Sequence, residues 1–400
     1  MKIVDKVAFL VHEPVVYSHY SSVWAEMKRD SFAIILFYDF DRESLQKVPG
    51  ANDVIRKIVE NGYEFHYFND LRRDNIKFKY VVSNHKISGK TSDTPSARSR
   101  LSGKIKVVAK QLVNFALGVA NRPKKYFIKY NYSTQFAPLQ VGLRQIRFMY
   151  GADIGDGWSL QDWNEIYDLF LCHGPNDEAQ LRKRFRGKTE VMGYPRYDGY
   201  FSPDLDVGPT IREFGIKPDR ETILWMPTLG DDANSIPFFA NAVSKLSSEY
   251  NVIVRPHPIS FRLEPQKIDM LKSLSFVIDD DSTRDMNELF KVADIILCDY
   301  GGSAFGAIYL GKKLILLDVP GSEKQYTVVN SSNLELREHI TTLDADNAFR
   351  LKSVLEDDSE WEKQSPIRRK LFLKYFADTR GSSSKRAAKI LMNLDSVFEA

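Results

Sequence analysis

The chain is poor in cysteine and has no long apolar run. Its two cysteines, Cys172 and Cys298, each lie inside an apolar stretch and lack the spacing of a metal site. This usage excludes a disulfide-stapled secreted scaffold and is typical of buried thiols in a reducing cytosol. No run reaches the roughly 18 apolar residues of a spanning helix, and Met1 to Leu10 has the pattern of a first strand instead of a signal peptide. We therefore expect a cytoplasmic protein without membrane spans.

Acidic residues are almost missing from one long window. Between Lys77 and Arg147 there are 15 Lys or Arg and one acid, Asp93, so the window carries +14. The whole chain carries +3, and the remainder therefore carries −11. Charge segregated on this scale indicates an anionic partner for one face. Nucleic acid is not the expected partner, because no nucleic-acid-binding motif or series of aromatic residues accompanies the charge.

The segment Lys104 to Ala120, within this window, has the length and composition of an interfacial helix. Such a helix binds an anionic membrane by inserting apolar side chains, and each basic residue near the surface contributes about 1 kcal/mol. An ordinary core helix flanked by basic loops is the alternative. The predicted membrane-binding residues are Lys104, Lys106, Lys110, Lys124 and Lys125.

Apolar strands alternate with helical segments along the chain, which at 400 residues and 43% hydrophobic content is long enough for two domains. Lys6–Val11 and Thr222–Met226 are the first predicted strands of the two halves. This alternation predicts an α/β fold of two doubly wound, Rossmann-like domains, each with a parallel sheet, whose strand-end loops face a shared cleft. A stretch with two prolines and a glycine, 202–209, places the predicted boundary between domains 1–203 and 204–400. The C-terminal helices can pack back against the first domain.

The segment Asp294 to Asp318 has the pattern strand, glycine turn, helix and strand. Gly301 and Gly302 permit a sharp turn, Ser303 is a candidate N-cap, and the apolar run that follows predicts the helix. Free N–H groups at such a helix start favour a phosphate or diphosphate at the carboxyl edge of a parallel sheet. A tight turn without a ligand is the alternative interpretation.

Arg255-Pro256-His257-Pro258 is the most specific local motif. Two prolines restrict the backbone around His257 just past a predicted strand, so the imidazole is held at the strand-end edge. A histidine there can donate to a phosphate oxygen or relay a proton near neutral pH. Arg255 can offer several donors to a diphosphate. A purely structural role of the histidine in the turn is the alternative.

Four motifs resemble, in order and spacing, those of the CDP-glycerol glycerophosphotransferases, which build teichoic acids and related glycerol-phosphate polymers. They are Gly193-Tyr194-Pro195-Arg196-Tyr197-Asp198, Pro227-Thr228, Arg255-Pro256-His257-Pro258 and Asp299-Tyr300. The resemblance covers roughly Tyr167 to Arg386. It implies a glycosyltransferase-B-type fold, a CDP-linked donor bound by the second domain, and a lipid-linked or polymeric glycan acceptor at the membrane surface. The donor-binding residues that it suggests, together with the glycine turn, are Arg196, Thr228, Arg255, Asp299, Gly301, Gly302 and Ser303.

Two departures from the family pattern bear on the chemistry. The family has two serines where this chain has Gly301 and Gly302, and a His-Gly pair in the first domain where the best match here is Tyr150-Gly151. A tyrosine titrates near pH 10, against about 6.5 for histidine, so Tyr150 is a poor general base at neutral pH. Either another residue is the base or the acceptor differs from the usual one. The other candidate bases are His12, His173 and Asp153.

These observations predict a transferase at the inner face of the cell membrane. An acceptor hydroxyl attacks the β-phosphate of CDP-glycerol or a related CDP-alditol and CMP leaves, with His257 at the phosphoryl group and no cofactor or metal required. We interpret two short acidic runs, Asp39-Phe40-Asp41 and Asp279 to Asp281, as solvated turns, and a metal site is the alternative interpretation. A nucleotide-sugar glycosyltransferase is the first alternative. A catalytically degenerate homologue that binds lipid or a partner enzyme is the second.

Overall fold

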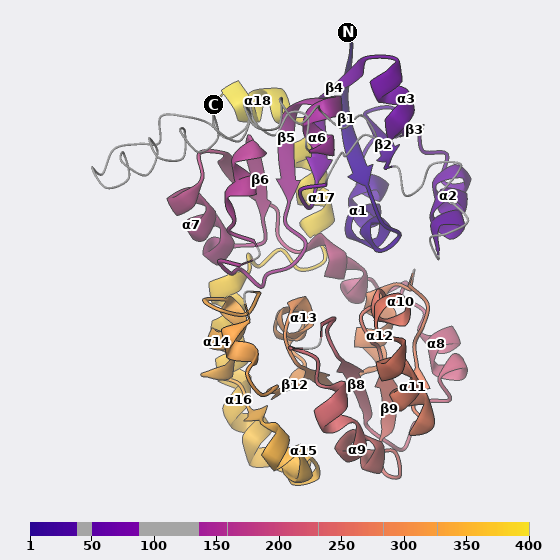
Figure 1. Ribbon diagram of the computed structural model, residues 1–400, viewed down its shortest axis with the longest axis vertical. Coiled ribbons are helices and arrows are strands. Elements are labelled where there is room, and N and C mark those ends of the chain that lie inside the picture. The colour runs from indigo at the N-terminus through magenta and orange to yellow at the C-terminus, as the bar shows by residue number, and fades with distance from the viewer. Residues whose placement is uncertain are drawn as a thin grey trace, which may run out of the picture.

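The computed structural model describes residues 1–37, 50–87, 136–157, 159–230, 232–282, 284–325 and 327–399. The five predicted membrane-binding lysines between Lys104 and Lys125, and the run Asp39 to Asp41, lie outside these ranges. Figure 1 shows two lobes stacked along the long axis of the molecule, each built on its own sheet. Among the described helices, none combines the length and the apolar character needed to cross a membrane.

The first sheet is parallel and, within the described ranges, has seven strands in the order β3-β2-β1-β4-β5-β6-β7. Its strands are β1 (Lys2–Val11), β2 (Phe32–Leu36), β3 (Phe65–Tyr67), β4 (Ile76–Ser83), β5 (Gly142–Phe148), β6 (Leu169–Cys172) and β7 (Lys188–Val191). All of β2 and the second half of β1 are buried, as expected for strands covered on both faces. The helices of this first lobe are α1 (Val15–Glu26), α2 (Ala51–Glu60), α3 (Phe68–Arg73), α6 (Ala137–Val141) and α7 (Pro175–Arg184).

The second sheet is also parallel, and its six strands in the described part of the chain follow the order β10-β9-β8-β11-β12-β13. They are β8 (Thr222–Met226), β9 (Asn251–Val254), β10 (Val277–Ile278), β11 (Ile295–Cys298), β12 (Lys313–Leu317) and β13 (Thr342–Leu343). The helices of this second lobe include α8 (Gly208–Glu213), α9 (Ile236–Leu246), α10 (Ser260–Leu263), α11 (Pro265–Ser273), α12 (Met286–Val292), α13 (Gly302–Leu310), α14 (Ser332–Arg337) and α15 (Leu351–Leu355). The predicted fold class, α/β with two doubly wound parallel sheets, is confirmed.

The C-terminal helices connect the lobes. The chain leaves the first lobe through the 3-10 helix η4 (Pro195–Phe201), and α16 (Asp358–Tyr375) runs along the second lobe (Figure 1). The last helices, α17 (Ser383–Met392) and α18 (Leu394–Glu399), return to the first lobe, where Leu391 and Leu394 join its core. An ion pair of 2.7 Å between Lys79 and Asp395 holds α18 there. The predicted boundary at residue 203 falls just past η4.

Several local predictions need correction. The motif from Gly193 to Asp198 is partly helical: η4 begins at Pro195, because a proline at the first position favours the start of a helix. Ser303 is not the N-cap of α13: Gly301 is, with a φ of 109° that side chains disfavour. Strand β4, the neighbour of β1, was not predicted at all. Both cysteines are free and buried, as expected.

Candidate active site

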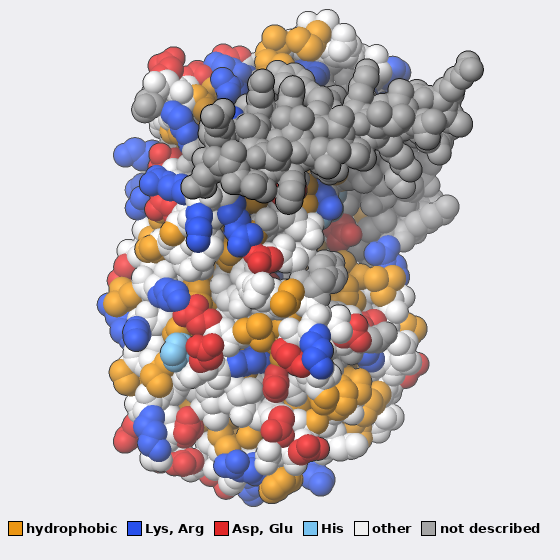
Figure 2. Space-filling view, turned by 60° about the vertical axis from the view of Figure 1, so that its left-hand side comes forward, with side chains coloured by type: hydrophobic (Ala, Val, Ile, Leu, Met, Phe, Trp, Pro, Cys, Tyr) orange, Lys and Arg blue, Asp and Glu red, His pale blue; other side chains and the backbone are white. Residues whose placement is uncertain are grey.

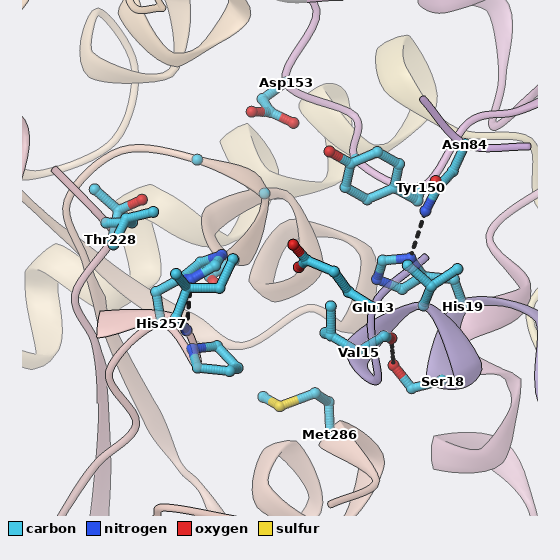
Figure 3. Close-up of a pocket in the computed structure, with 18 of the residues that line it drawn as sticks. Glu13, Val15, Ser18, His19, Asn84, Tyr150, Asp153, Thr228, His257 and Met286 are labelled. Carbon is cyan, nitrogen blue, oxygen red and sulfur yellow. Dashed lines mark hydrogen bonds between the residues drawn. The ribbon is translucent and has the colours of Figure 1, made fainter. Parts of the chain in front are cut away.

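Each sheet reverses its strand order at one place, between β1 and β4 in the first and between β8 and β11 in the second. Ligands of open parallel sheets bind beyond the carboxyl ends of the strands at such a switch point. The two switch points face one cleft of about 710 Å³ between the lobes, to which His12, Lys86, Thr228 and Gly301 contribute. The topology thus places the strand-end residues of both lobes around a single cavity, part of which is drawn in Figure 3.

Most of the predicted site residues line this cleft. They are His12, Tyr150, Asp153, Arg196, Thr228, Arg255, His257, Gly301, Gly302 and Ser303. His173 and Asp299 do not line it; both are fully buried. We call the side formed by His12, Glu13, His19, Asn84, Lys86, Tyr150 and Asp153 the first-lobe wall. The side formed by Thr228, Arg255, His257 and Gly301 to Ser303 is the second-lobe wall. The predicted roles of these residues stay predictions.

His257 is held in one orientation by its loop. Its backbone N–H donates to Pro227 O at 3.1 Å, and its Nδ1 accepts the N–H of Ile259 at 3.2 Å. Because Nδ1 is an acceptor, the proton of the neutral ring is on Nε2. Burial lowers the pKa of His257 to about 4, so the ring is neutral near pH 7. The side chain is half-buried, and it offers an uncharged N–H donor.

The start of α13 supplies backbone donors to the second-lobe wall. The Gly301 N–H donates to Asn333 Oδ1 at 3.1 Å. The next two N–H groups, those of Gly302 and Ser303, have no hydrogen-bond partner among the described residues, as is usual for the first turn of a helix. Both residues line the cleft. This end of α13 has the geometry that favours a phosphate.

Asp153 faces this turn from the first-lobe wall. An ideal Cβ built on Gly302 would lie 3.8 Å from Asp153 Oδ1. Burial raises the pKa of Asp153 to about 6, because a carboxylate is poorly solvated there. Figure 3 shows its carboxyl group at the edge of the cavity, on the same side as Tyr150. An acid that titrates close to neutral pH is suited to general base catalysis.

The two predicted donor-binding arginines differ in their surroundings. Arg255 Nη1 is bonded to Asp279 Oδ2 at 2.7 Å, and Arg284 Nε contacts the other carboxylate oxygen of Asp279 at 2.9 Å. The interpretation of Asp279 as part of a solvated turn was therefore wrong, because it is a buried counter-ion. Arg196 forms no ion pair in the described part of the chain, and its Nε is buried without a hydrogen-bond partner there. Arg196 is thus the better placed cation for an anionic ligand.

Asp299 lies beneath the cleft and organises its second-lobe wall. Its carboxylate accepts the N–H groups of Thr228 at 2.9 Å, Ser235 at 2.8 Å and Tyr300 at 2.8 Å. These bonds join the loops that follow β8 and β11. Burial raises its pKa to about 6, although the hydrogen bonds favour the ionised form. Asp299 was predicted to bind the donor directly, but its side chain has no access to the cavity. It holds the loops of the second-lobe wall in position instead.

The candidate bases are separated by their environments. Burial raises the pKa of Tyr150 above its ordinary value and lowers that of His12 to about 3, so neither accepts a proton readily near pH 7. His173 is away from the cleft, with its Nδ1 3.0 Å from Asp177 Oδ2 at the start of α7. Asp153 is the candidate that combines a place on the cleft with a pKa near neutrality.

Comparison with known proteins decides the family. Residues 69–393 match the family model described as CDP-Glycerol:Poly(glycerophosphate) glycerophosphotransferase. The chain belongs to this family. A teichoic acid poly(glycerol phosphate) polymerase of Bacillus spizizenii is 29% identical over 170 residues, 39% of this chain. The match spans 42% of that polymerase, so the chain corresponds to less than half of this relative's length.

Solved structures share the fold. A variant of the wall teichoic acid polymerase TagF superposes with a TM-score of 0.63 at 13% identity, over 99% of this chain and 90% of that one. The S. aureus MnaA–UDP co-structure gives 0.55 at 12% identity, over 99% and 98% of the two chains. At these identities the likeness is one of fold. The resemblance to the glycerophosphotransferase family and the glycosyltransferase-B-like architecture are thereby confirmed.

The cleft of this family member is also lined by residues that the sequence pattern did not reveal. His19, Asn84, His85 and Lys86 line the first-lobe wall, and the last three follow β4, the strand that was missed. Within the described residues, no group of three His, Cys, Asp or Glu is arranged to hold a metal ion. The alternating apolar residues of 76–83 were the signal that would have located β4 and the residues behind it.

Proposed function

We propose that the protein transfers glycerol phosphate from CDP-glycerol to a hydroxyl of a polymeric acceptor in the synthesis of a teichoic-acid-type polymer. The observation that carries this proposal is that Asp153 lies close to the unpaired N–H donors of Gly302 and Ser303, across one cleft. A diphosphate site beside a carboxylate that titrates near neutral pH suits the transfer of a phosphoryl group to a hydroxyl. Family membership supports the same donor.

In this mechanism the N–H groups of Gly302 and Ser303, with Arg196, bind the diphosphate of the donor. The acceptor hydroxyl attacks the β-phosphorus and gives its proton to Asp153 as the new O–P bond forms. The bond between the β-phosphorus and the bridging oxygen breaks, and CMP leaves with the electron pair. His257 donates its Nε2–H to an oxygen of the transferring group, whose charge increases in the transition state.

Binding of the donor is also expected to change the pKa of Asp153, the proposed base. A diphosphate bound at the start of α13 places negative charge next to Asp153, and a like charge raises the pKa of a carboxyl group further. Asp153 then becomes a stronger base when the donor is in place. Near pH 6 the carboxyl group of Asp153 is protonated, and therefore uncharged, for part of the time. Its repulsion of the incoming anionic donor is weaker in that form.

A thermal-shift comparison tests the donor. CDP, CMP and CDP-glycerol should raise the melting temperature through mass action, and UDP should raise it less. Arg196→Gln should remove most of the shift by CDP-glycerol, whereas Arg212→Gln, at an exposed position of α8, serves as the matched control. A clear shift with UDP beside none with the cytidine nucleotides would favour the nucleotide-sugar alternative.

We also propose that the acceptor is lipid-linked and that the protein binds an anionic membrane at its cytoplasmic face. The acid-poor window from Lys77 to Arg147 supports this, with a charge of +14. The end of α7 and the turn after it add Arg182, Lys183, Arg184 and Arg186, all exposed on the same lobe. Figure 2 shows Lys and Arg side chains along one side of the upper lobe, with Asp and Glu side chains among them, and side chains of both signs on the lower lobe.

A further inference from the structure

His19 is fixed in the first-lobe wall from two sides. It lies on α1, and its Nδ1 is 3.0 Å from the amide nitrogen of Asn84 at the end of β4. Its ring stacks on Tyr150 with a centroid distance of 4.9 Å and an interplanar angle of 16°. Only 5% of the residue surface is exposed, yet it lines the cleft. Both the position and the plane of this imidazole are therefore set by the fold.

The contact with Asn84 determines which nitrogen carries the proton. An amide nitrogen only donates, so Nδ1 accepts and the hydrogen of the neutral ring is on Nε2. Burial, with the nearby charge of Arg196, keeps the pKa of His19 well below its ordinary value, so the ring is neutral at physiological pH. Nε2 makes no hydrogen bond to any described residue, and Figure 3 shows it turned away from Asn84 toward the side of Glu13.

His257 has the same arrangement on the opposite wall. Its Nδ1 also accepts a hydrogen bond, from the Ile259 N–H, and its Nε2 also carries the proton. The cavity therefore contains an oriented, uncharged N–H donor on each wall: His257 on the loop that follows β9, and His19 beside Tyr150 in the segment that leads to Asp153.

We infer that His19 binds the acceptor in the proposed reaction, donating its Nε2–H to an oxygen of a polyol chain end whose hydroxyl attacks the donor. A neutral donor suits a hydroxyl or ether oxygen, whereas the phosphates of the donor find Arg196 and the start of α13. The stack on Tyr150 links this contact to the loop that holds Asp153. His19 is thus a positioning residue for the acceptor, and this inference rests on the proposed function.

Two amide substitutions separate the roles of the ring nitrogens. In His19→Gln the side-chain amide reaches the place of Nε2, and in His19→Asn it reaches only the place of Nδ1. The acceptor KM, measured with a synthetic glycerol phosphate oligomer, should rise on the order of tenfold in His19→Asn and much less in His19→Gln. The KM for CDP-glycerol should stay unchanged in both variants. Equal acceptor KM values in the wild type and His19→Asn would overturn the inference and leave the proposed function intact.

A second measurement determines which ring nitrogen of His19 is protonated, and it does not require turnover. Long-range ¹H–¹⁵N spectra of the protein with ¹⁵N-labelled histidine should show His19 protonated on Nε2, and that signal should move when the glycerol phosphate oligomer is added. Asn84→Asp replaces the amide with an acceptor, so the proton should move to Nδ1 and the acceptor KM should rise. A wild-type ring protonated on Nδ1, or an Nε2 signal indifferent to the oligomer, would refute the inference. Failure of CDP-glycerol turnover alone would refute only the proposed function.

Discussion

Asp153 and Gly302 face each other across the cleft, such that a Cβ on Gly302 would lie 3.8 Å from the Asp153 carboxylate. The first belongs to a loop of the first lobe and the second to the initial turn of α13. Their proximity brings a proton acceptor and a phosphate-binding turn to the same place. The loop that holds Asp153 is also bonded to the start of α14 in the second lobe, since the Ser332 N–H donates to Ile154 O at 2.8 Å.

Replacement of Asp153 by Asn should lower kcat by about 10²–10⁴-fold while CDP-glycerol still binds. The wild-type rate should rise with pH through the pKa of Asp153, about 6 in the free protein and higher with the donor bound. This dependence should be absent in Asp153→Asn. The measurement is the pH profile of kcat, with calorimetry for donor binding. An unchanged acidic limb in the variant would exclude Asp153 as the base.

Asp153→Asn should also change how the stability of the fold depends on pH. Asp153 has a folded pKa of about 6 against the ordinary 3.8, so the folded state binds the proton more tightly than the unfolded state. Its contribution is present below about pH 4 and is lost as pH rises through 6, reaching a cost of up to about 3 kcal/mol. Asp153→Asn should therefore raise the melting temperature at pH 8 more than at pH 4. Equal shifts at both pH values would contradict the raised pKa.

His257→Ala should lower turnover by about 10²–10³-fold, because it removes a donor to the transferring phosphoryl group. The stability cost should be about 1 kcal/mol, since the hydrogen bond from Ile259 N–H is lost as well. Steady-state kinetics and thermal unfolding measure the two effects. His339→Ala, at an exposed histidine outside the cleft, is the control and should change neither. A His257→Ala enzyme with most of its activity would make the residue structural.

The two glycines of the turn should respond differently to alanine. Gly301 has a φ of 109°, where a side chain is strained, so Gly301→Ala should cost about 1 kcal/mol or more. At Gly302 the new methyl group would have only ordinary contacts, 3.8 and 3.9 Å away, and helix propensity favours alanine. Gly302→Ala should therefore keep or slightly raise the melting temperature. A larger loss at Gly302 than at Gly301 would contradict the turn geometry.

Membrane binding can be tested by co-sedimentation with liposomes. Pelleting should increase with the fraction of anionic lipid and fall in 1 M salt, where the Debye length is about 3 Å. It should be lost when the five predicted lysines, Lys104, Lys106, Lys110, Lys124 and Lys125, are changed together to Glu. The control reverses five exposed lysines of the second lobe and α16: Lys217, Lys245, Lys272, Lys324 and Lys363. Equal pelleting with neutral and anionic vesicles would contradict the electrostatic attraction.

The sequence allowed the fold to be predicted where local patterns are strong. The run from β11 to β12 was predicted because its strands are continuous apolar stretches and two glycines mark the turn. Strand β4 was missed because Lys77 and Lys79 suggested a basic segment. In the structure these lysines reach out of the sheet, to Leu139 O and to Asp395, while Phe78 between them is buried.

The candidate site was predicted in part. Motifs at strand ends located His257 and the glycine turn, because prolines and glycines constrain the chain locally. Partners distant in sequence left no such pattern: the pairing of Arg255 with Asp279 and the stack of His19 on Tyr150 depend on how the sheets and helices pack. The choice of Asp153 over His12 as base likewise depends on burial.

The most direct test of the central claim is the transfer reaction itself. The protein is incubated with CDP-glycerol labelled in the glycerol and with a glycerol phosphate oligomer, and released CMP and labelled polymer are measured together. We predict one CMP for each glycerol phosphate added in the wild type, and both products formed at least about 10²-fold more slowly with Asp153→Asn. Turnover of a UDP-sugar, with CDP-glycerol left intact under the same conditions, would contradict the account.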